Sequence, residues 1–224
     1  MITALLPMKA HSERVPNKNM KTFHGVPLYH AVANTLSTSD YINEVIINTD
    51  SDVIRKDATK HFEKIKIIDR PKALLGDFVP MNDIIAYDVA QSNATYFLQT
   101  HSTNPMLSTE SINKAIETYF ANLDKYDSLF SVTRLQTRLY RQDGKAINHN
   151  PAELLRTQDL PPVYEENSCF YIFSNESFNA AGNKRIGLKP MMFEIDKIEA
   201  VDIDEPVDFI MAETLYKLRK ANEI

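Results

Sequence analysis

The chain has 224 residues, of which 43% are hydrophobic and 25% are charged. This length and balance fit one globular α/β domain with a sizeable core, or one domain with a small appendage. The formal net charge of -5 argues against nucleic acid or an anionic membrane surface as a partner. The single cysteine, Cys169, excludes an intrachain disulfide and a cysteine-based metal cluster.

The N-terminal segment "MITALLP" predicts a strand and not a signal peptide, because no charged segment precedes its short apolar run. No apolar run approaches the ~20 residues that are needed to cross a bilayer. We therefore expect a cytoplasmic protein that makes no membrane contact.

Up to about residue 130, short apolar and β-branched segments alternate with segments of helical periodicity. This alternation predicts βαβ units, and hence a Rossmann-like, doubly wound, mostly parallel sheet with helices on both faces. Ser51 and either Ser108 or Thr109 are expected to cap helices. The expected strands are ITALLP, EVIINTD, IKIID, ATYFLQT and SLFSVT, and the expected helices are 27–38, 51–61, 81–92 and 109–122.

The pattern changes from about Arg134. A turn at Asp143 and Gly144 lies between strand-like segments, which indicates a hairpin or an excursion from the main sheet. We expect one domain, 1–224, with an inserted arm at approximately 134–165. Beyond the arm the sequence predicts strands at Ser168–Phe173, "MMFEI" and "EAVDID", and a closing helix from about Pro206 to Lys220.

The loop after the first strand, "PMKAHSERVPNKN", is basic and has no glycine. Doubly wound folds bind ligands beyond the carboxyl ends of their strands, and a triphosphate there needs cations and hydrogen-bond donors. The lack of glycine excludes a P-loop or a dinucleotide fingerprint, so the loop would bind with side chains. A solvated basic loop is the alternative, although Pro16 stiffens this one. The candidate side chains are Lys9, Ser12, Arg14 and Lys18.

The spacing Ser-x-Arg-x-Pro-x-Lys resembles the signature loop of sugar nucleotidyltransferases. The resemblance is strongest to the cytidylyltransferases that make CMP-activated acidic sugars, the acylneuraminate and octulosonate enzymes. Here Lys9 stands where that family has arginine, and Ser168 stands where it has glycine. Further resembling segments follow in family order over nearly the whole chain: "INTD", "DRP", "LLGD", "LQTHSTNP" and "LLRTQDLPPVYEENSCFYIF".

This resemblance implies a nucleotide-diphospho-sugar transferase fold and a homodimer in which the arm of one subunit covers the other's site. The implied reaction is attack by the anomeric hydroxyl of a 2-keto sugar acid on the α-phosphorus of CTP, with release of pyrophosphate. Lys9, Arg14 and Lys18 would be catalytic. The implied nucleotide contacts are Lys9, Ser12, Arg14, Lys18, Asn19, Arg70 and Asp77, and the implied sugar contacts are Gln99 and Arg156.

Arg156 follows the apolar residues "ELL", which we interpret as a strand whose end presents the guanidinium. Such a group favours a bidentate contact with a carboxylate. An ion pair with Glu165 or Glu166 is the alternative. In the resembling family, the aligned arginine holds the substrate carboxylate.

The segment "VDIDEP" places Asp202 and Asp204 on one face of an expected strand end. Two such carboxylates suit Mg²⁺, and the resemblance favours this cofactor. Asp204 or Glu205 could also cap the last helix, and both roles can hold at once. His101 is expected to be a hydrogen-bonded structural residue more than a general base, and Cys169 a buried apolar one.

Two other functions remain open. A nucleotide-sugar-dependent glycosyltransferase also combines a Rossmann-like half with a D-x-D metal site, although its D-x-D usually lies in mid-chain. A non-catalytic nucleotide-binding relative would keep the fold and lose the reaction, and the substitutions at Met8, Lys9 and Ser168 favour it. Release of pyrophosphate from CTP in the presence of a sugar acid would distinguish a cytidylyltransferase from both alternatives.

Overall fold

The computed structural model describes residues 2–76 and 78–223. Its core is a seven-stranded sheet in the order β5-β4-β1-β6-β8-β7-β9. β8 pairs antiparallel with both its neighbours and the other pairings are parallel, so the prediction of a mostly parallel, Rossmann-like sheet is confirmed. The strands are β1 (Ile2–Leu5), β4 (Ile42–Thr49), β5 (Ile65–Asp69), β6 (Tyr96–Thr100), β7 (Ser128–Leu135), β8 (Val163–Ser174) and β9 (Pro190–Glu194).

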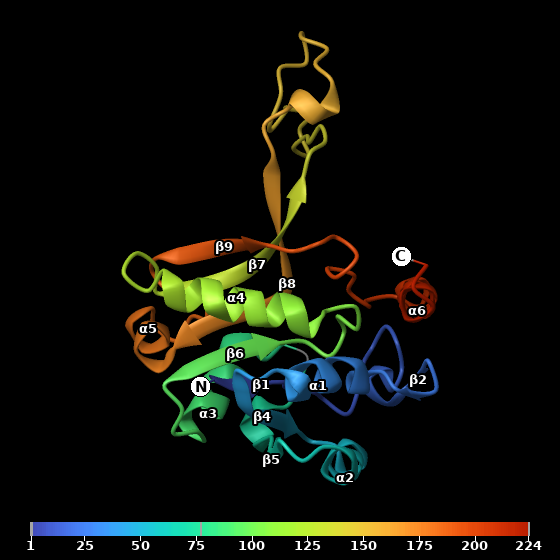
Figure 1. Cartoon of the computed structure of the whole chain (residues 1–224), viewed down its shortest axis with the longest axis vertical. Coiled ribbons are helices and arrows are strands. Elements are labelled where there is room, and N and C mark those ends of the chain that lie inside the picture. Colours follow the sequence, from blue (N-terminus) through green and yellow to red (C-terminus); the bar gives the residue numbers. More distant parts are fainter. Residues whose placement is uncertain (1, 77, 224) are drawn as a thin grey trace.

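Helices cover both faces of this sheet (Figure 1). Buried side chains of α1, α2 and α4 share one apolar cluster, and those of α3 and α5 belong to a second cluster on the opposite face. α6 packs instead on the small β2–β3 hairpin, through Phe209 and Phe23. The bounds are β2 (Thr22–Phe23), β3 (Val26–Pro27), α1 (Tyr29–Thr38), α2 (Asp52–His61), α3 (Met81–Ala90), α4 (Thr109–Ala121), α5 (Asn175–Ala180) and α6 (Pro206–Lys220).

Successive side chains of a strand point to opposite faces of the sheet, which determines the residues that each side chain contacts. On β6, Leu98 faces the cluster of α1 and α4, whereas Phe97 faces the cluster of α3 and α5. Gln99 therefore lies on the same face as Phe97. Its partner across the antiparallel ladder is Tyr171 of β8, which belongs to that second cluster. The register thus brings a polar residue and an aromatic residue together near the carboxyl end of β6.

The predicted helices are present, and their caps explain where they begin. The Ser51 hydroxyl accepts the backbone N–H of Ile54 at the start of α2, and Ser108 caps α4 in the same way. Glu205 caps α6 through a capping box. The short helix α5 was not predicted, because six residues carry too little periodicity to be recognised.

The predicted strand "EAVDID" is wrong. Residues 199–204 form no strand, although Ile203 is fully buried between its exposed or half-buried neighbours as alternation required. The segment lies beyond the end of β6, where the backbone N–H of Ile203 donates to Thr103 at 2.9 Å. One such bond holds an extended loop in place without building a ladder.

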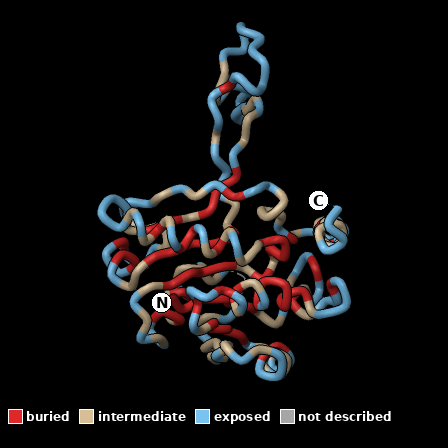
Figure 2. Tube along the Cα trace, in the orientation of Figure 1, coloured by how far each residue is buried: buried red, intermediate tan, exposed pale blue. Residues whose placement is uncertain are grey.

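β7 and β8 extend past the sheet as a long projecting hairpin (Figure 1). Residues 136–162 form its tip, where the turn at Gly144 and a bridge between Tyr140 and Ala146 make a small hairpin. Most of this tip is exposed to solvent (Figure 2). Among the described residues, none of the helices is both long and apolar enough to cross a membrane.

Candidate functional site

A pocket opens at the carboxyl end of β1, where the glycine-free loop meets the chain that follows β6. Buried Met8 and Val15 anchor the loop, and its polar side chains are left at the surface between them. The five loop residues predicted to bind a nucleotide therefore come together. The lining comprises Pro7, Met8, Lys9, Ser12, Glu13, Arg14, Lys18 and Asn19 on the loop side, and His101, Ser102 and Thr103 on the other.

Asn19 fixes the shape of the loop. Its side-chain amide donates to the carbonyl of Lys9 at 3.2 Å, and its Oδ1 accepts the Ser102 hydroxyl at 2.7 Å. Asn17, in the left-handed region at φ 52°, turns the chain into the short 3-10 helix that begins at Lys18. The two walls of the pocket are thus joined through a single buried amide.

Arg14 and Lys18 face the C-terminal acidic segment. Arg14 Nη2 lies 2.7 Å from Asp204 Oδ1, and Lys18 Nζ lies 3.8 Å from the same oxygen. Lys18 also donates to the Ile203 carbonyl at 2.5 Å, and burial lowers its pKa. Two cations predicted to bind phosphate and one carboxylate predicted to bind a metal therefore form one cluster.

Asp202 and Asp204 lie on either side of buried Ile203. Asp202 is exposed as a whole residue, but its carboxylate is hydrogen-bonded to Thr103. Partial loss of water raises the pKa of Asp202, and the negative charge of Asp204 adds to the rise. Two carboxylates that disfavour each other's charge fit a divalent cation held by oxygen ligands.

Arg70 lies at the end of β5 and its guanidinium binds Asn48, through Nε to Oδ1 at 2.8 Å and through Nη2 to the backbone carbonyl at 3.0 Å. It does not line the loop pocket. Asn48 in turn donates to the buried carboxylate of Asp88, whose pKa burial raises to about 7. Asp77, also predicted to contact the nucleotide, lies outside the described residues.

Gln99 is fully buried and binds an arginine that the sequence analysis missed. Arg185 Nη1 donates to Gln99 Oε1 at 2.7 Å, and the Arg185 guanidinium carbon lies 3.8 Å from the centre of the Tyr171 ring. No motif signals Arg185, because it comes from an irregular loop between α5 and β9. Its two partners, Gln99 and Tyr171, are neighbours only through the register of β6 and β8, which the structure provides.

The predicted placement of Arg156 is wrong. No strand precedes it, and it begins a short 3-10 helix in the projecting tip, where its side chain is 72% exposed. Neither predicted acid is its partner, since its Nε lies 2.7 Å from Asp159 Oδ2 three residues away. The leucines of "ELL" led to the prediction of a buried strand, but they lie at the surface, where Leu154 is 92% exposed. Arg156 lies in the tip that projects beyond the sheet (Figure 1), and it does not line the loop pocket.

Ser168 adopts φ 58°, a left-handed conformation that glycine adopts most easily. It lies in a bulge of β8 that interrupts the pairing with β7 between Phe130 and Val132. Its hydroxyl lies 3.2 Å from the Tyr171 hydroxyl. The serine thus keeps the turn while adding a polar contact to Tyr171.

His101 lines the loop pocket, and burial followed by the charge of Arg185 lowers its pKa to about 4. Its Nε2 lies 3.3 Å from Gln99 Nε2. With so low a pKa the imidazole is a weak base, which suits a hydrogen-bonding group of the wall better than a general base. Buried Cys169, whose thiol pKa burial raises, is equally suited to packing.

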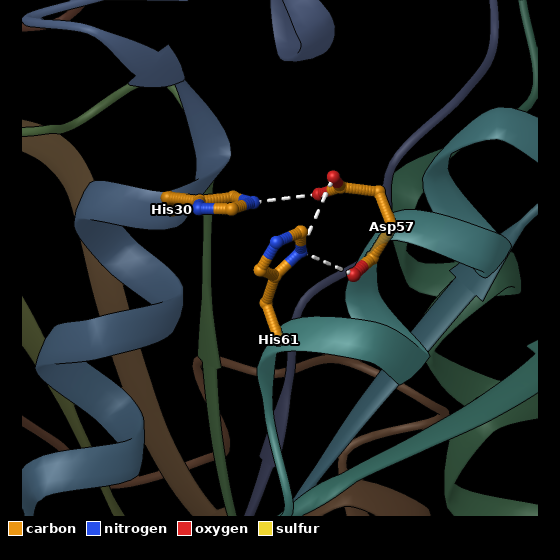
Figure 3. A group of neighbouring side chains, drawn as sticks. All are labelled: His30, Asp57 and His61. Carbon is orange, nitrogen blue, oxygen red and sulfur yellow. Dashed lines mark hydrogen bonds and ion pairs between the residues drawn. The ribbon is translucent and has the colours of Figure 1, made fainter.

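Another group of possible metal ligands lies on α1 and α2, where His30 and His61 converge on Asp57 (Figure 3). The side chains of this group form a hydrogen-bond network. Asp57 Oδ2 accepts the Tyr29 hydroxyl and lies 2.6 Å from His30 Nε2, and His61 Nδ1 lies 2.8 Å from the Asp57 carbonyl. These bonds join α1 to α2, away from the residues that line the loop pocket.

A pocket lined by cations at the carboxyl end of β1 is typical of nucleotide-binding proteins with a Rossmann-like sheet. Comparison with known proteins identifies the family within this class. A family model described as Cytidylyltransferase matches residues 3–223, so the chain belongs to the cytidylyltransferase family. The predicted family is thereby confirmed.

Named relatives lie within the same family. Pseudaminic acid cytidylyltransferase of Campylobacter jejuni is 25% identical over 230 residues, which cover 96% of this chain and 95% of the relative. CMP-N,N'-diacetyllegionaminic acid synthase of Legionella pneumophila is 26% identical, with 98% and 97% covered. N-acylneuraminate cytidylyltransferase A of Danio rerio is 27% identical over 95% of this chain and 50% of its own length.

Solved structures share the fold at low identity. CMP:2-keto-3-deoxy-manno-octonic acid synthetase, solved in complex with CTP, superposes with a TM-score of 0.70 at 9% identity, covering 98% of this chain and all of that one. The 4-diphosphocytidyl-2C-methyl-D-erythritol synthase of Anaerococcus prevotii gives 0.67 at 13% identity, with 96% of both chains covered. These likenesses concern the fold.

Proposed function

We propose that this cytidylyltransferase transfers CMP from CTP to the anomeric hydroxyl of a 2-keto sugar acid and releases pyrophosphate. The observation that carries the proposal is that Arg14 and Lys18, which line the loop pocket, both lie within ion-pair distance of Asp204. Relatives named for pseudaminic, legionaminic and N-acylneuraminic acids support an acidic sugar as the acceptor.

In this proposal the loop holds the triphosphate. Lys9, Arg14 and Lys18 neutralise the phosphates and the departing pyrophosphate, and the Ser12 hydroxyl donates a hydrogen bond. Asn19 keeps the two pocket walls in register through its bonds to Lys9 and Ser102. Positioning and charge stabilisation are sufficient for in-line phosphoryl transfer, so no covalent intermediate with the protein is required.

Arg70 and Asp77 would contact the base or the ribose. Arg70 is already oriented by its two bonds to Asn48. The proposed acceptor side is the neighbouring end of β6, where Gln99 lies two residues before His101 of the pocket wall.

Mg²⁺ is the proposed cofactor, with Asp202 and Asp204 as its protein ligands. When bound, it would supply Lewis-acid stabilisation of the phosphate charge. The chain's own contribution is to hold the two carboxylates beside the cationic loop, through the contacts of Ile203 with Thr103 and Lys18.

We further propose that the active unit is a homodimer. The projecting tip exposes Tyr140, Ile147 and Leu154, and such apolar groups on a narrow projection favour a protein partner. In a dimer, the tip of one subunit would place its Arg156, which pairs with Asp159 in the single chain, beside the sugar acid bound in the other's pocket.

The test is pyrophosphate release from CTP and Mg²⁺ with a panel of 2-keto sugar acids. We expect turnover with at least one acid and none without an acceptor. Release of CMP from a preformed CMP-sugar, without pyrophosphate formation, would instead support a glycosyltransferase. CTP binding without turnover of any acid would support the non-catalytic alternative.

A further inference from the structure

Arg185 is a half-buried cation that has no ion-pair partner among the described residues. Its guanidinium contacts only neutral groups, namely the amide oxygen of Gln99 and the ring of Tyr171. Glu166 acts on it at longer range and uses its own carboxylate to bind the Tyr171 hydroxyl. A desolvated guanidinium that no carboxylate contacts directly is costly, so a ligand that supplies a negative charge in contact with it is favoured there.

Gln99 orients the Arg185 guanidinium. Its side chain is fully buried, its Nε2 donates to the Thr100 carbonyl at 2.7 Å, and its Oε1 accepts from Arg185. The second amide hydrogen faces His101 Nε2 at 3.3 Å. Both amide hydrogens are thus engaged within the protein, and in this proposal Gln99 is a positioning residue for Arg185 in place of the predicted direct sugar contact.

The backbone around Arg185 is fixed as firmly as its side chain. Asp127 accepts the backbone N–H groups of Leu188 and Lys189 at 2.9 Å, and the Ser128 hydroxyl binds the Ile186 carbonyl. At Gly187, with φ 72°, a Cβ atom would lie 2.4 Å from Asp127 Oδ1, so the approach requires glycine. A long side chain held at both its base and its tip is preorganised for binding.

The tip of this side chain lies at the acceptor side of the proposed active site. Gln99 and Tyr171 are ladder partners near the carboxyl end of β6, and His101 continues from there into the wall of the loop pocket. Tyr171 also meets the bulge through the hydroxyl of Ser168. Arg185 thus adjoins the loop pocket from the face of the sheet that α3 and α5 cover.

We propose that Arg185 binds the carboxylate of the acceptor within the same subunit. The guanidinium has five N–H donors in a planar fork, and one hydrogen bond to Gln99 leaves others for a carboxylate. The inference rests on the proposed function and makes it more specific. It assigns the acid group of the sugar to a residue of the core, whereas sequence resemblance assigned it to Arg156 of the tip.

The decisive experiment compares a sugar acid with its methyl ester, which keeps the sugar but lacks the charge. The acid that gives the highest turnover in the panel, chosen from pseudaminic, N,N'-diacetyllegionaminic and N-acetylneuraminic acids, serves as the probe. We expect Arg185→Gln to raise the KM for the acid by about 10- to 100-fold and to abolish most of the preference for acid over ester. The KM for CTP should stay unchanged.

Gln99→Glu provides a second variant that keeps the side-chain size. It places a carboxylate next to Arg185 Nη1, so the guanidinium would form an ion pair within the protein. The charge would then no longer attract the carboxylate of the substrate, and the preference for acid over ester should be lost. Arg185→Lys should recover part of the preference, because a point charge lacks the fork. Arg55→Gln, which removes an exposed arginine of α2, is the matched control and should behave as wild type.

The possible outcomes distinguish a failure of the Arg185 assignment from a failure of the proposed function. A wild type that releases no pyrophosphate with any acid would overturn the proposed function. An active wild type whose Arg185→Gln variant keeps the full preference for acid over ester would overturn the role of Arg185 alone. Equal loss of activity on acid and ester would show that Arg185 serves the fold and not the carboxylate.

Discussion

Arg14 and Asp204 are 190 residues apart in sequence, and their side chains form an ion pair with Nη2 2.7 Å from Oδ1. Both side chains are about half exposed, so the pair adds little stability on its own. Its value is that a proposed phosphate ligand and a proposed metal ligand hold each other in place. A nucleotide that arrives with its cation would satisfy both groups at once.

Asp204→Asn tests the metal assignment. We expect pyrophosphate release to fall about 100-fold or more, because one charged oxygen ligand is lost. CTP binding in EDTA should not weaken, since Arg14 loses a competing acid. Initial rates with and without Mg²⁺, together with CTP titrations in EDTA, check both points. Glu205→Gln, which removes the weaker 3.5 Å contact to Arg14, is the control. Full Mg²⁺-dependent turnover in Asp204→Asn would contradict the assignment.

Lys18→Met tests the role of the loop in holding the triphosphate. The methionine keeps the buried stem but loses the charge and the bond to the Ile203 carbonyl. We expect the KM for CTP to rise about 10- to 100-fold, because a hydrogen bond to a charged group is lost. Steady-state kinetics with CTP as the varied substrate measure it. Lys21→Met, which removes a cation stacked on Phe209 outside the pocket, should leave that KM near the wild-type value.

Asp88 predicts a pH dependence of stability. Burial raises its pKa to about 7 in the folded protein, and one of its carboxylate oxygens has no hydrogen-bond partner. The folded state therefore binds this proton more tightly than the unfolded state does. The resulting stabilisation is complete below the unfolded pKa near 4 and is lost as the pH rises through about 7, by up to about 1.4 kcal/mol per pH unit.

Thermal unfolding between pH 4 and pH 8 measures this effect. Asp88→Asn keeps a polar partner for Asn48 but cannot ionise, so its unfolding midpoint should fall less than that of the wild type across the range. Parallel curves for the two proteins would mean that Asp88 titrates normally.

Leu154→Lys tests the proposed dimer. Leu154 is 92% exposed at the projecting tip, so the substitution should not disturb the fold of one subunit. A charge placed in an apolar contact should shift the mass measured by light scattering from dimer towards monomer. Leu188→Lys, at an exposed leucine in the loop before β9, should not change the mass. A wild type that elutes as a monomer at every concentration would disprove the dimer.

Asp57→Ala tests the network between α1 and α2. It removes the acceptor shared by the Tyr29 hydroxyl and His30, leaving two largely buried donors unpaired. We expect the free energy of unfolding to fall by about 2 kcal/mol or more. Urea denaturation measures the change. His61→Ala, at the more exposed edge of the network, should cost less.

Sequence patterns predicted the sheet and the cationic loop, because both are local. Strand alternation, helix periodicity and the Ser51 and Ser108 caps act over a few residues, and the structure reproduces them. The loop residues come together for the same reason, since Lys9 and Asn19 are only ten positions apart.

The errors arise where burial depends on tertiary placement. "ELL" has the composition of a strand but lies on an exposed tip, and "EAVDID" alternates correctly but has no ladder to join. Arg185 carries no local signal at all. Its importance comes from the register that pairs Gln99 with Tyr171, 72 positions apart by their residue numbers.

β8 belongs to two parts of the molecule. Its first half is one leg of the projecting hairpin, and its second half carries Tyr171 beneath the Arg185 guanidinium. The bulge at Ser168 is the joint between them. One continuous strand thus connects the exposed tip with the tyrosine ring on which the arginine lies. A partner that binds the tip would therefore contact the same strand that supports the proposed carboxylate-binding arginine.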